Sequence, residues 1–158
     1  FSPKGDTVRI GVAMSDGSAR LTLKSMSLRS VLNQSVQAVT LPDSHDVELD
    51  VVAPVDVRMR LDEARLRVAF CTLIAVLARA QSGVATIDLR LSKRGGWATI
   101  VITPRTFGRG KIVDLPLDVS RPGSGLLLPI AESIIDAHGG KLRERWLAGR
   151  WSGFVVKL

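Results

Sequence analysis

The segment SRPGSGLLLPIAESIIDAHGGKLRERW, residues Ser120 to Trp146, carries the most specific pattern in this 158-residue chain. A loop of small residues, Gly123-Ser124-Gly125, precedes a run whose apolar residues recur at helical spacing. His138-Gly139-Gly140 ends the run, and a strand pattern follows. Backbone N–H groups at such a loop and helix N-terminus can bind a phosphate. A loop, a core helix and a glycine at the helix end explain the same spacing without any ligand, and this is the simpler interpretation.

Length and composition indicate one globular domain with an aliphatic core, because 46% of the residues are hydrophobic and only 4% are aromatic. No apolar run reaches the roughly 20 residues that span a bilayer. The single cysteine, Cys71, lies in an apolar helical run, which is typical of a small buried residue in a reducing compartment. The chain begins at Phe1 rather than Met, so we expect a fragment of a longer protein.

The formal charge of +7 suits an acidic partner. Most basic residues are scattered along the sequence, and Arg105, Arg109 and Lys111 form the one local group. We therefore expect these three to be possible partner contacts, although they would serve solubility equally well. Few aromatic residues are present to stack on bases, so nucleic-acid binding is not expected.

Periodicity and turn residues predict the order of elements. Helices are predicted after N-caps at Ser27 and Asp62, and again after the Gly-Ser-Gly loop. The Gly95-Gly96 pair predicts a hairpin. Residues 103–122 are predicted to be one long loop. Strands are expected at 8–12, 19–26, 47–51, 55–59, 85–91, 97–102, 141–146 and 153–158. This order favours a two-layer α/β sandwich, with a mixed, largely antiparallel sheet and helices on one face.

Five segments, in this order, resemble a known domain: LTLKSMSLRSVL, LDEARLRVAFCTLIAVLARA, WATIVITPRTFG, GSGLLLPIAESIIDAHGGKL and RWSGFVVKL. Together they are similar to the catalytic, ATP-binding domain of bacterial sensor histidine kinases, within the GHKL superfamily. The resemblance covers about Ala19 to Leu158. Residues 1–18 are interpreted as an N-terminal extension or linker.

The resemblance implies a Bergerat ATPase-like fold with three main helices on one face of the sheet. Family members bind ATP and magnesium between two helices, under a mobile lid. The resemblance also implies a cytoplasmic location, which includes the cytoplasmic part of a membrane-bound sensor, with no direct membrane contact by this fragment.

Three positions of the second predicted helix match the family's metal-binding face. Val76 falls where active members have the asparagine that coordinates magnesium, and Thr72 falls on a second frequent asparagine. Arg79 lies on the same face and could meet phosphates. Magnesium requires oxygen ligands, and a valine supplies none.

The first glycine box of the family falls on residues 104–108. Pro104 replaces the aspartate that accepts the adenine amine, and proline has no side-chain acceptor. Thr106 replaces the first glycine, while Gly108 remains. In the second box Gly123 and Gly125 are kept, but Leu127 stands where a glycine allows phosphate to approach the backbone closely.

These replacements lead to the hypothesis of a degenerate, pseudokinase-like domain of a sensor histidine kinase or histidine phosphotransferase, without a catalytic residue, metal or cofactor. It would act in a phosphorelay by contacting a helical dimerisation or phosphotransfer domain, a receiver domain or a partner kinase. The alternative is a domain that still binds ATP and magnesium in an altered mode, with Arg79, Gly123 and Gly125 on the phosphates, and supports histidine autophosphorylation.

His138 belongs to the Ala-His-Gly-Gly signature and is predicted to be structural, near a helix C-terminus that favours a cation. His45 lies in a polar turn and is predicted to be solvated. Neither histidine is expected to accept a phosphoryl group.

Overall fold

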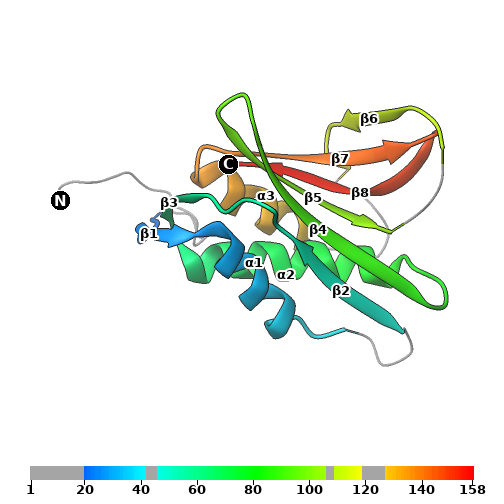
Figure 1. Ribbon diagram of the computed structural model, residues 1–158, viewed down its shortest axis with the longest axis horizontal. Helices are drawn as coiled ribbons and strands as arrows, with labels where there is room; N and C mark the ends of the chain where they lie inside the picture. Colours follow the sequence, from blue (N-terminus) through cyan, green and yellow to red (C-terminus); the bar gives the residue numbers. More distant parts are fainter. Residues whose placement is uncertain (1–19, 42–45, 106–108, 119–126) are drawn as a thin grey trace.

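The computed structural model describes residues 20–41, 46–105, 109–118 and 127–158. Within these ranges, three helices cover one face of a six-stranded sheet, and two further strands form a separate small sheet (Figure 1). The helices are α1 (Leu28–Ala38), α2 (Glu63–Arg79) and α3 (Leu127–Ala137). The strands are β1 (Lys24–Ser27), β2 (Val47–Val52), β3 (Arg58–Leu61), β4 (Ala85–Arg94), β5 (Trp97–Pro104), β6 (Ile112–Leu115), β7 (Lys141–Leu147) and β8 (Arg150–Lys157). The predicted two-layer α/β sandwich is therefore confirmed.

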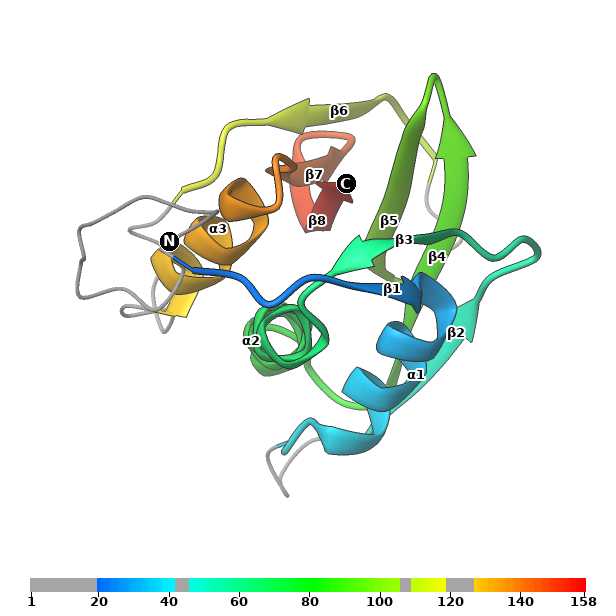
Figure 2. The same ribbon diagram turned by 90° about the vertical axis from the view of Figure 1, so that its left-hand side faces the viewer.

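The main sheet has the strand order β2-β4-β5-β8-β7-β6. Strand β2 runs parallel to β4, and the pairs from β4 to β6 are antiparallel, so the sheet is mixed and largely antiparallel as expected. The predicted turn at Gly95-Gly96 joins β4 to β5, and both glycines have positive φ, as a tight hairpin requires. Figure 2 shows that the sheet curls, so that β6 and the β4–β5 hairpin rise on either side of β7 and β8.

Strand alternation separates the two faces of the sheet. Leu89, Ile102 and Phe154 lie side by side on adjacent strands and are fully buried beneath the helices. Helix α2 presents buried residues on most of its surface, although Val68 is 51% exposed. The predicted burial of this helix is thus largely correct. No helix among the described residues is both long enough and apolar enough to cross a membrane.

Side-chain caps begin the first two helices where the sequence predicts them. The Ser27 hydroxyl accepts a hydrogen bond from the Ser30 N–H, and the Asp62 carboxylate accepts one from the Arg65 N–H. Asp56, which precedes β3, accepts hydrogen bonds from the Ser27 hydroxyl and the Arg29 N–H. The bond from Ser27 is the main reason that the pKa of Asp56 is lowered.

Two predictions of local structure differ from the fold. The predicted loop at 103–122 contains β6, whose four residues are too few to show a strand period but pair with the open edge of β7. The strand predicted at 19–26 is instead the short β1, which pairs with β3 outside the main sheet. The strand predicted at 8–12, and with it the extension 1–18, lies outside the described residues.

Cys71 is half-buried rather than buried. Its thiol donates to the Ser35 carbonyl oxygen on α1, at 3.4 Å. Burial raises the pKa of the thiol, so it stays protonated near neutral pH. The side chain therefore acts as a packing group between α1 and α2, close to its predicted role.

Gly153 in β8 has φ +118°, and a Cβ atom there would collide with the Ile102 carbonyl oxygen on β5. We expect Gly153→Ala to lower the free energy of unfolding by about 3 kcal/mol or more, because the backbone of two central strands must shift. Gly149→Ala is the matched control, since Gly149 has φ +79° and no atom within 4 Å of such a Cβ. The control should cost only about 1–2 kcal/mol in urea unfolding. Equal losses in the two variants would contradict the close approach of β8 to β5.

Candidate functional site

The described residues at the family's nucleotide positions come from the C-terminal half of α2, the end of β5 and the start of α3. On α2, Thr72 is half-buried, Val76 is only 5% exposed and Arg79 is exposed at the last helical position. The three residues of the predicted common face therefore differ in exposure: Val76 lies in the core, Thr72 at its border and Arg79 in solvent. Val76 belongs to the hydrophobic core, and Leu127, the first residue of α3, packs against the same core.

This arrangement offers few polar groups to a ligand. The side chains of valine, proline and leucine supply neither a hydrogen-bond donor nor an oxygen atom, so Thr72 and Arg79 are the polar side chains among the five described positions, which also include Val76, Pro104 and Leu127. Across the described ranges, no group of three or more His, Cys, Asp or Glu residues is placed to hold a metal ion. Thr106, Gly108, Gly123 and Gly125 lie outside the described residues, so their roles remain predictions.

Pro104 is the last residue of β5 and lies half-buried opposite Ile87 of β4. Its neighbour Thr103 donates a hydrogen bond of 2.7 Å to the Ser152 carbonyl oxygen, and the two hydroxyl oxygens lie 3.1 Å apart. Both side chains belong to buried residues. The hydroxyls next to Pro104 are therefore already engaged between β5 and β8, a contact that links distant segments and has no signal in the sequence.

Arg105 follows Pro104 and is held by two carboxylates. Its Nη2 atom lies 2.6 Å from Oδ1 of Asp88 and 2.6 Å from Oδ2 of Asp50, while its Nε atom lies 3.2 Å from Oδ2 of Asp88. Asp88 is the first cause, and Asp50 the second, of a raised pKa for the guanidinium. The Arg105 N–H also donates to the Thr86 carbonyl oxygen at 2.7 Å. Arg105 is thus committed to ion pairs inside the domain, which the predicted grouping with Arg109 and Lys111 did not anticipate.

The other two basic residues of that group are exposed. Arg109 lines, together with Arg105, a hollow of about 420 Å³ on the face of the sheet that the helices leave open. Lys111 does not line it, and its carbonyl oxygen accepts a hydrogen bond of 2.9 Å from the Ala148 N–H. The structure therefore brings two of the three predicted contact residues together.

His138 connects the end of α3 to the start of α2. Its Nδ1 atom lies 2.8 Å from the Ile134 carbonyl oxygen, and its Nε2 atom accepts a hydrogen bond of 3.0 Å from the Asp62 N–H. Nδ1 must then carry the proton, and the ring is neutral. Burial lowers the pKa of His138. The predicted structural role is consistent with these contacts, but the ring is neutral rather than the expected cation.

Asp62 extends this connection to the segment that enters the domain. Its carboxylate accepts a hydrogen bond of 2.8 Å from the Thr22 N–H, in addition to capping α2. A second buried carboxylate, Glu144, accepts from the Asp118 N–H at 3.0 Å and from the Trp146 indole N–H at 3.1 Å. Buried acidic residues thus fix the chain before β1 and after β6. The sequence marks Asp62 as a cap but gives no sign of these longer contacts.

No family model matches the sequence. Among curated proteins, the sensor histidine kinase ZraS of Salmonella typhi is 26% identical over 151 residues, which cover 89% of this chain and 32% of the relative. ZraS of Salmonella typhimurium is 25% identical with the same coverage. The chain thus spans about a third of the length of these curated relatives.

Solved structures of the same kind have the same fold. The mycobacterial sensor histidine kinase MprB superposes with a TM-score of 0.65 at 21% identity, covering 87% of this chain and 97% of that one. The nucleotide-free catalytic domain of histidine kinase ThkA superposes with a TM-score of 0.64 at 14% identity, covering 87% and 95%. The resemblance in the sequence and the fold that it implies are both confirmed.

The neutral state of His138 predicts a pH dependence of stability. The unfolded imidazole, with an ordinary pKa of 6.5, binds a proton that the folded site excludes. The contribution of the neutral His138 ring to the free energy of unfolding is therefore complete above pH 6.5, and it is lost as the pH falls below that value. Unfolding in urea at several pH values should show this loss in the wild type and not in His138→Ala.

Two features make that comparison specific. His45, the other histidine, is present in both proteins and cancels. Burial raises the pKa of Glu132 and Asp136 on α3, so these carboxyls favour folding as the pH falls and act in the opposite sense. If His138→Ala lost the same stability below pH 6.5, the result would contradict a neutral His138 ring between α3 and α2.

The Arg105 network predicts unequal effects at its two carboxylates. Asp88→Asn should lower the melting temperature more than Asp50→Asn, because the Asp88 side chain is 3% exposed and that of Asp50 is 51% exposed. Thermal unfolding measured by circular dichroism provides the comparison. A larger loss from Asp50→Asn would show that the buried pair does not anchor the end of β5.

Proposed function

We propose that this chain, whose fold is that of the sensor histidine kinase catalytic domains, is a degenerate catalytic domain of a phosphorelay protein. It binds ATP and magnesium weakly or not at all and acts through contacts with other proteins or domains. The observation that carries the proposal is the burial of Val76 in the core, 5% exposed, at the position where the resemblance places a metal ligand.

The argument from magnesium is one of ligand chemistry. Magnesium keeps near-octahedral oxygen coordination, usually with several bound waters. An aliphatic side chain that is packed into a core supplies no oxygen, and a hydrated ion beside it would have to displace its packing. Thr72 lies one turn earlier and offers one hydroxyl. A single hydroxyl without a neighbouring carboxylate or amide in this face of α2 is a poor basis for a magnesium site.

The argument from adenine rests on Pro104. The resemblance places there the carboxylate that accepts the exocyclic amine, and a proline side chain cannot accept a hydrogen bond. The adjacent Thr103 hydroxyl is occupied by Ser152. A base bound at this end of β5 would find an apolar ring in place of a specific acceptor, which supports weak and unselective binding.

The argument from the phosphates rests on Leu127. A side chain at the first residue of α3 packs against the core, whereas the family uses a glycine to let phosphate reach the backbone. Arg79 favours the alternative, altered-mode nucleotide binding that supports histidine autophosphorylation, because its exposed guanidinium makes no ion pair within the described residues. One cation without metal, adenine or backbone contacts gives little affinity.

The proposed partners are a helical dimerisation or phosphotransfer domain, a receiver domain or a partner kinase. They follow from the fold class, since the curated relatives are sensor histidine kinases roughly three times as long as this chain. In this proposal the domain supplies a stable surface rather than phosphoryl transfer. Its apolar nucleotide positions support that role, because they add to the core instead of holding water.

Calorimetric titration tests the proposal with ATP and ADP, with and without magnesium. We expect no heat and no thermal shift at millimolar nucleotide for the wild type. The double variant Val76→Asn with Pro104→Asp should gain magnesium-dependent binding, because it restores the metal ligand and the adenine acceptor. Val68→Asn, at an exposed position of the same helix, is the matched control and should gain none. Micromolar binding by the wild type would overturn the proposal.

A further inference from the structure

We propose that the face of the main sheet opposite the helices is a docking site for an acidic, partly apolar segment of another protein. This inference does not depend on the nucleotide question, because the groove around Val101 and Val155 contains none of the nucleotide positions, and Pro104 is the one such described position in the lining of the adjoining hollow. It rests on the shape of a groove, on uncompensated positive charge within it, and on its length.

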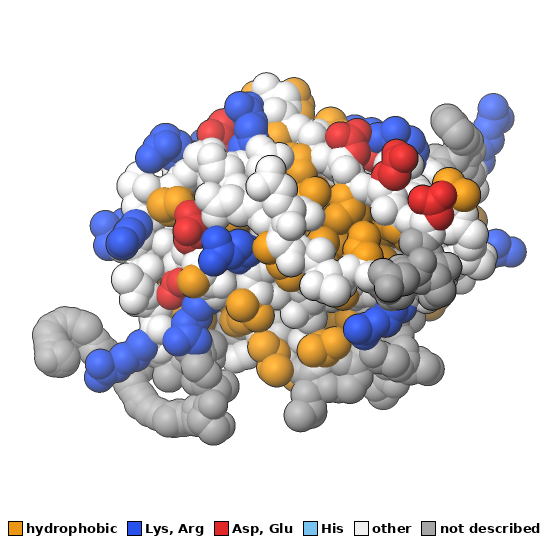
Figure 3. Space-filling view, turned by 90° about the horizontal axis from the view of Figure 1, so that it is seen from below, with side chains coloured by type: hydrophobic (Ala, Val, Ile, Leu, Met, Phe, Trp, Pro, Cys, Tyr) orange, Lys and Arg blue, Asp and Glu red, His pale blue; other side chains and the backbone are white. Residues whose placement is uncertain are grey.

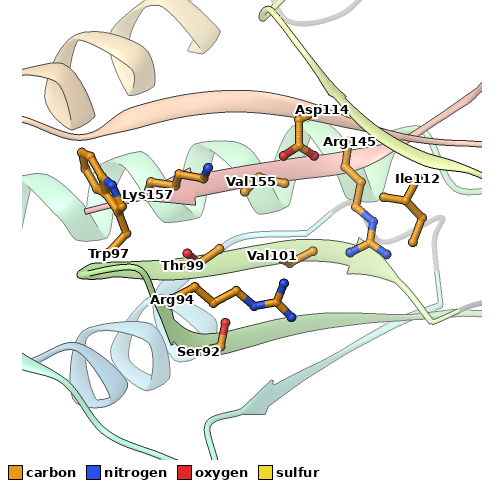
Figure 4. Close-up of a pocket in the computed structure, with 10 residues that line it drawn as sticks. All are labelled: Ser92, Arg94, Trp97, Thr99, Val101, Ile112, Asp114, Arg145, Val155 and Lys157. Atoms are coloured by element: carbon orange, nitrogen blue, oxygen red, sulfur yellow. The ribbon is translucent and has the colours of Figure 1, made fainter.

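The groove runs over the central strands. Val101 of β5 and Val155 of β8 face each other across the strand pair and line its floor. Trp97 stands at one end, on the β4–β5 hairpin, and Ile112 of β6 stands on the opposite side (Figure 4). The cavity measures about 370 Å³. The curl of the sheet visible in Figure 2 makes this face concave.

Positive charge gathers in the groove without a matching set of carboxylates. Arg94 from the hairpin and Arg145 from β7 extend into the same space, and Lys157 lies beside them on β8 (Figure 4). None of these three makes an ion pair within the described residues, and the buried Nε atom of Arg145 has no hydrogen-bond partner there. Asp114 is the one carboxylate in the described lining. This imbalance favours an anionic occupant.

The opposite side of the molecule has a different character. Figure 3 shows the face seen from below, where Lys and Arg side chains are scattered among acidic ones and hydrophobic side chains show between them. The described lining of the groove differs from this face, because it has three cationic side chains and one carboxylate.

Length favours a peptide segment over a single anion. The hollow that contains Arg109 shares Ile112 and Arg145 with the groove, so the two adjoin each other, and β5 lines both of them. From Trp97 at one end to Thr103 at the other, an extended strand covers about 20 Å, at roughly 3.3 Å per residue. That length suits an extended segment of about six residues, in which acidic side chains meet the cations and apolar ones meet Trp97 and Val101.

Other occupants fit less well. A second copy of this chain also carries +7 and is repelled. Single-stranded nucleic acid binds through a series of aromatic platforms, and Trp97 is the one aromatic side chain in the described lining of the two hollows. These occupants, and a simple inorganic anion, become outcomes of the test.

Fluorescence anisotropy tests the proposal with a labelled peptide in which glutamate alternates with valine. The variants are Arg94→Glu and, as the matched control, Lys24→Glu, which makes the same charge change on exposed β1 outside the groove. We expect salt-dependent binding by the wild type, a loss of about tenfold or more in Arg94→Glu and a change below about twofold in the control. Circular dichroism checks that both variants fold.

Three results would overturn the proposal. The first is no binding by the wild-type protein at low salt, and the second is an equal loss in the two variants. The third is a stronger interaction of the same face with phosphate or with an RNA oligonucleotide than with the peptide. The shift of the Trp97 indole signal in nuclear magnetic resonance spectra identifies the face in each titration. Since the probes Arg94 and Trp97 line the groove and are not nucleotide positions, either proposal can fail without the other.

Discussion

Helix α2 must bury a broad face, because the sheet lies on one side of it and α1 and α3 flank it (Figure 2). Every residue on its inner faces is therefore chosen by packing. A metal site at position 76 would place a polar side chain and water inside this apolar layer, which costs stability unless each group is paired. With valine the position instead contributes about 1.5–3 kcal/mol of apolar burial relative to an exposed side chain. The residue that consolidates the helix layer is the same one that leaves magnesium without a ligand.

Much of this fold follows from local patterns in the sequence. The caps at Ser27 and Asp62 and the turn at Gly95-Gly96 are chemical signals that act within a few residues. Strand β6 was not predicted, and neither was the pairing of β1 with β3 outside the main sheet, because short strands are defined by their partners and not by their own period. The resemblance located the nucleotide positions, and the structure adds that Val76 is core and Arg79 is solvent-exposed.

The contacts that the sequence could not predict are long-range polar ones. Arg105 donates a hydrogen bond to Asp50, which lies two strands away on β2. His138, after α3, accepts one from the Asp62 N–H at the start of α2. The basic surface on the helix-free face also depends on how the fold brings separate strands together. Arg90, Arg94, Arg143, Arg145 and Lys157 alternate with inward-facing residues on three strands, so no basic run appears in the sequence although the side chains share one surface.

Strand β8 is the last strand in chain order, yet it lies between β5 and β7 in the sheet. Among the described strands, β7 joins the sheet through β8 and β6 joins it through β7, so during synthesis neither can enter the sheet until β8 has left the ribosome. Helix α2 and the β4–β5 hairpin can form earlier, from local contacts. The sheet is thus completed late, when β8 enters between β5 and β7. Loss of a few residues from β8 would therefore separate β6 and β7 from the rest of the sheet, and would not merely shorten an edge strand.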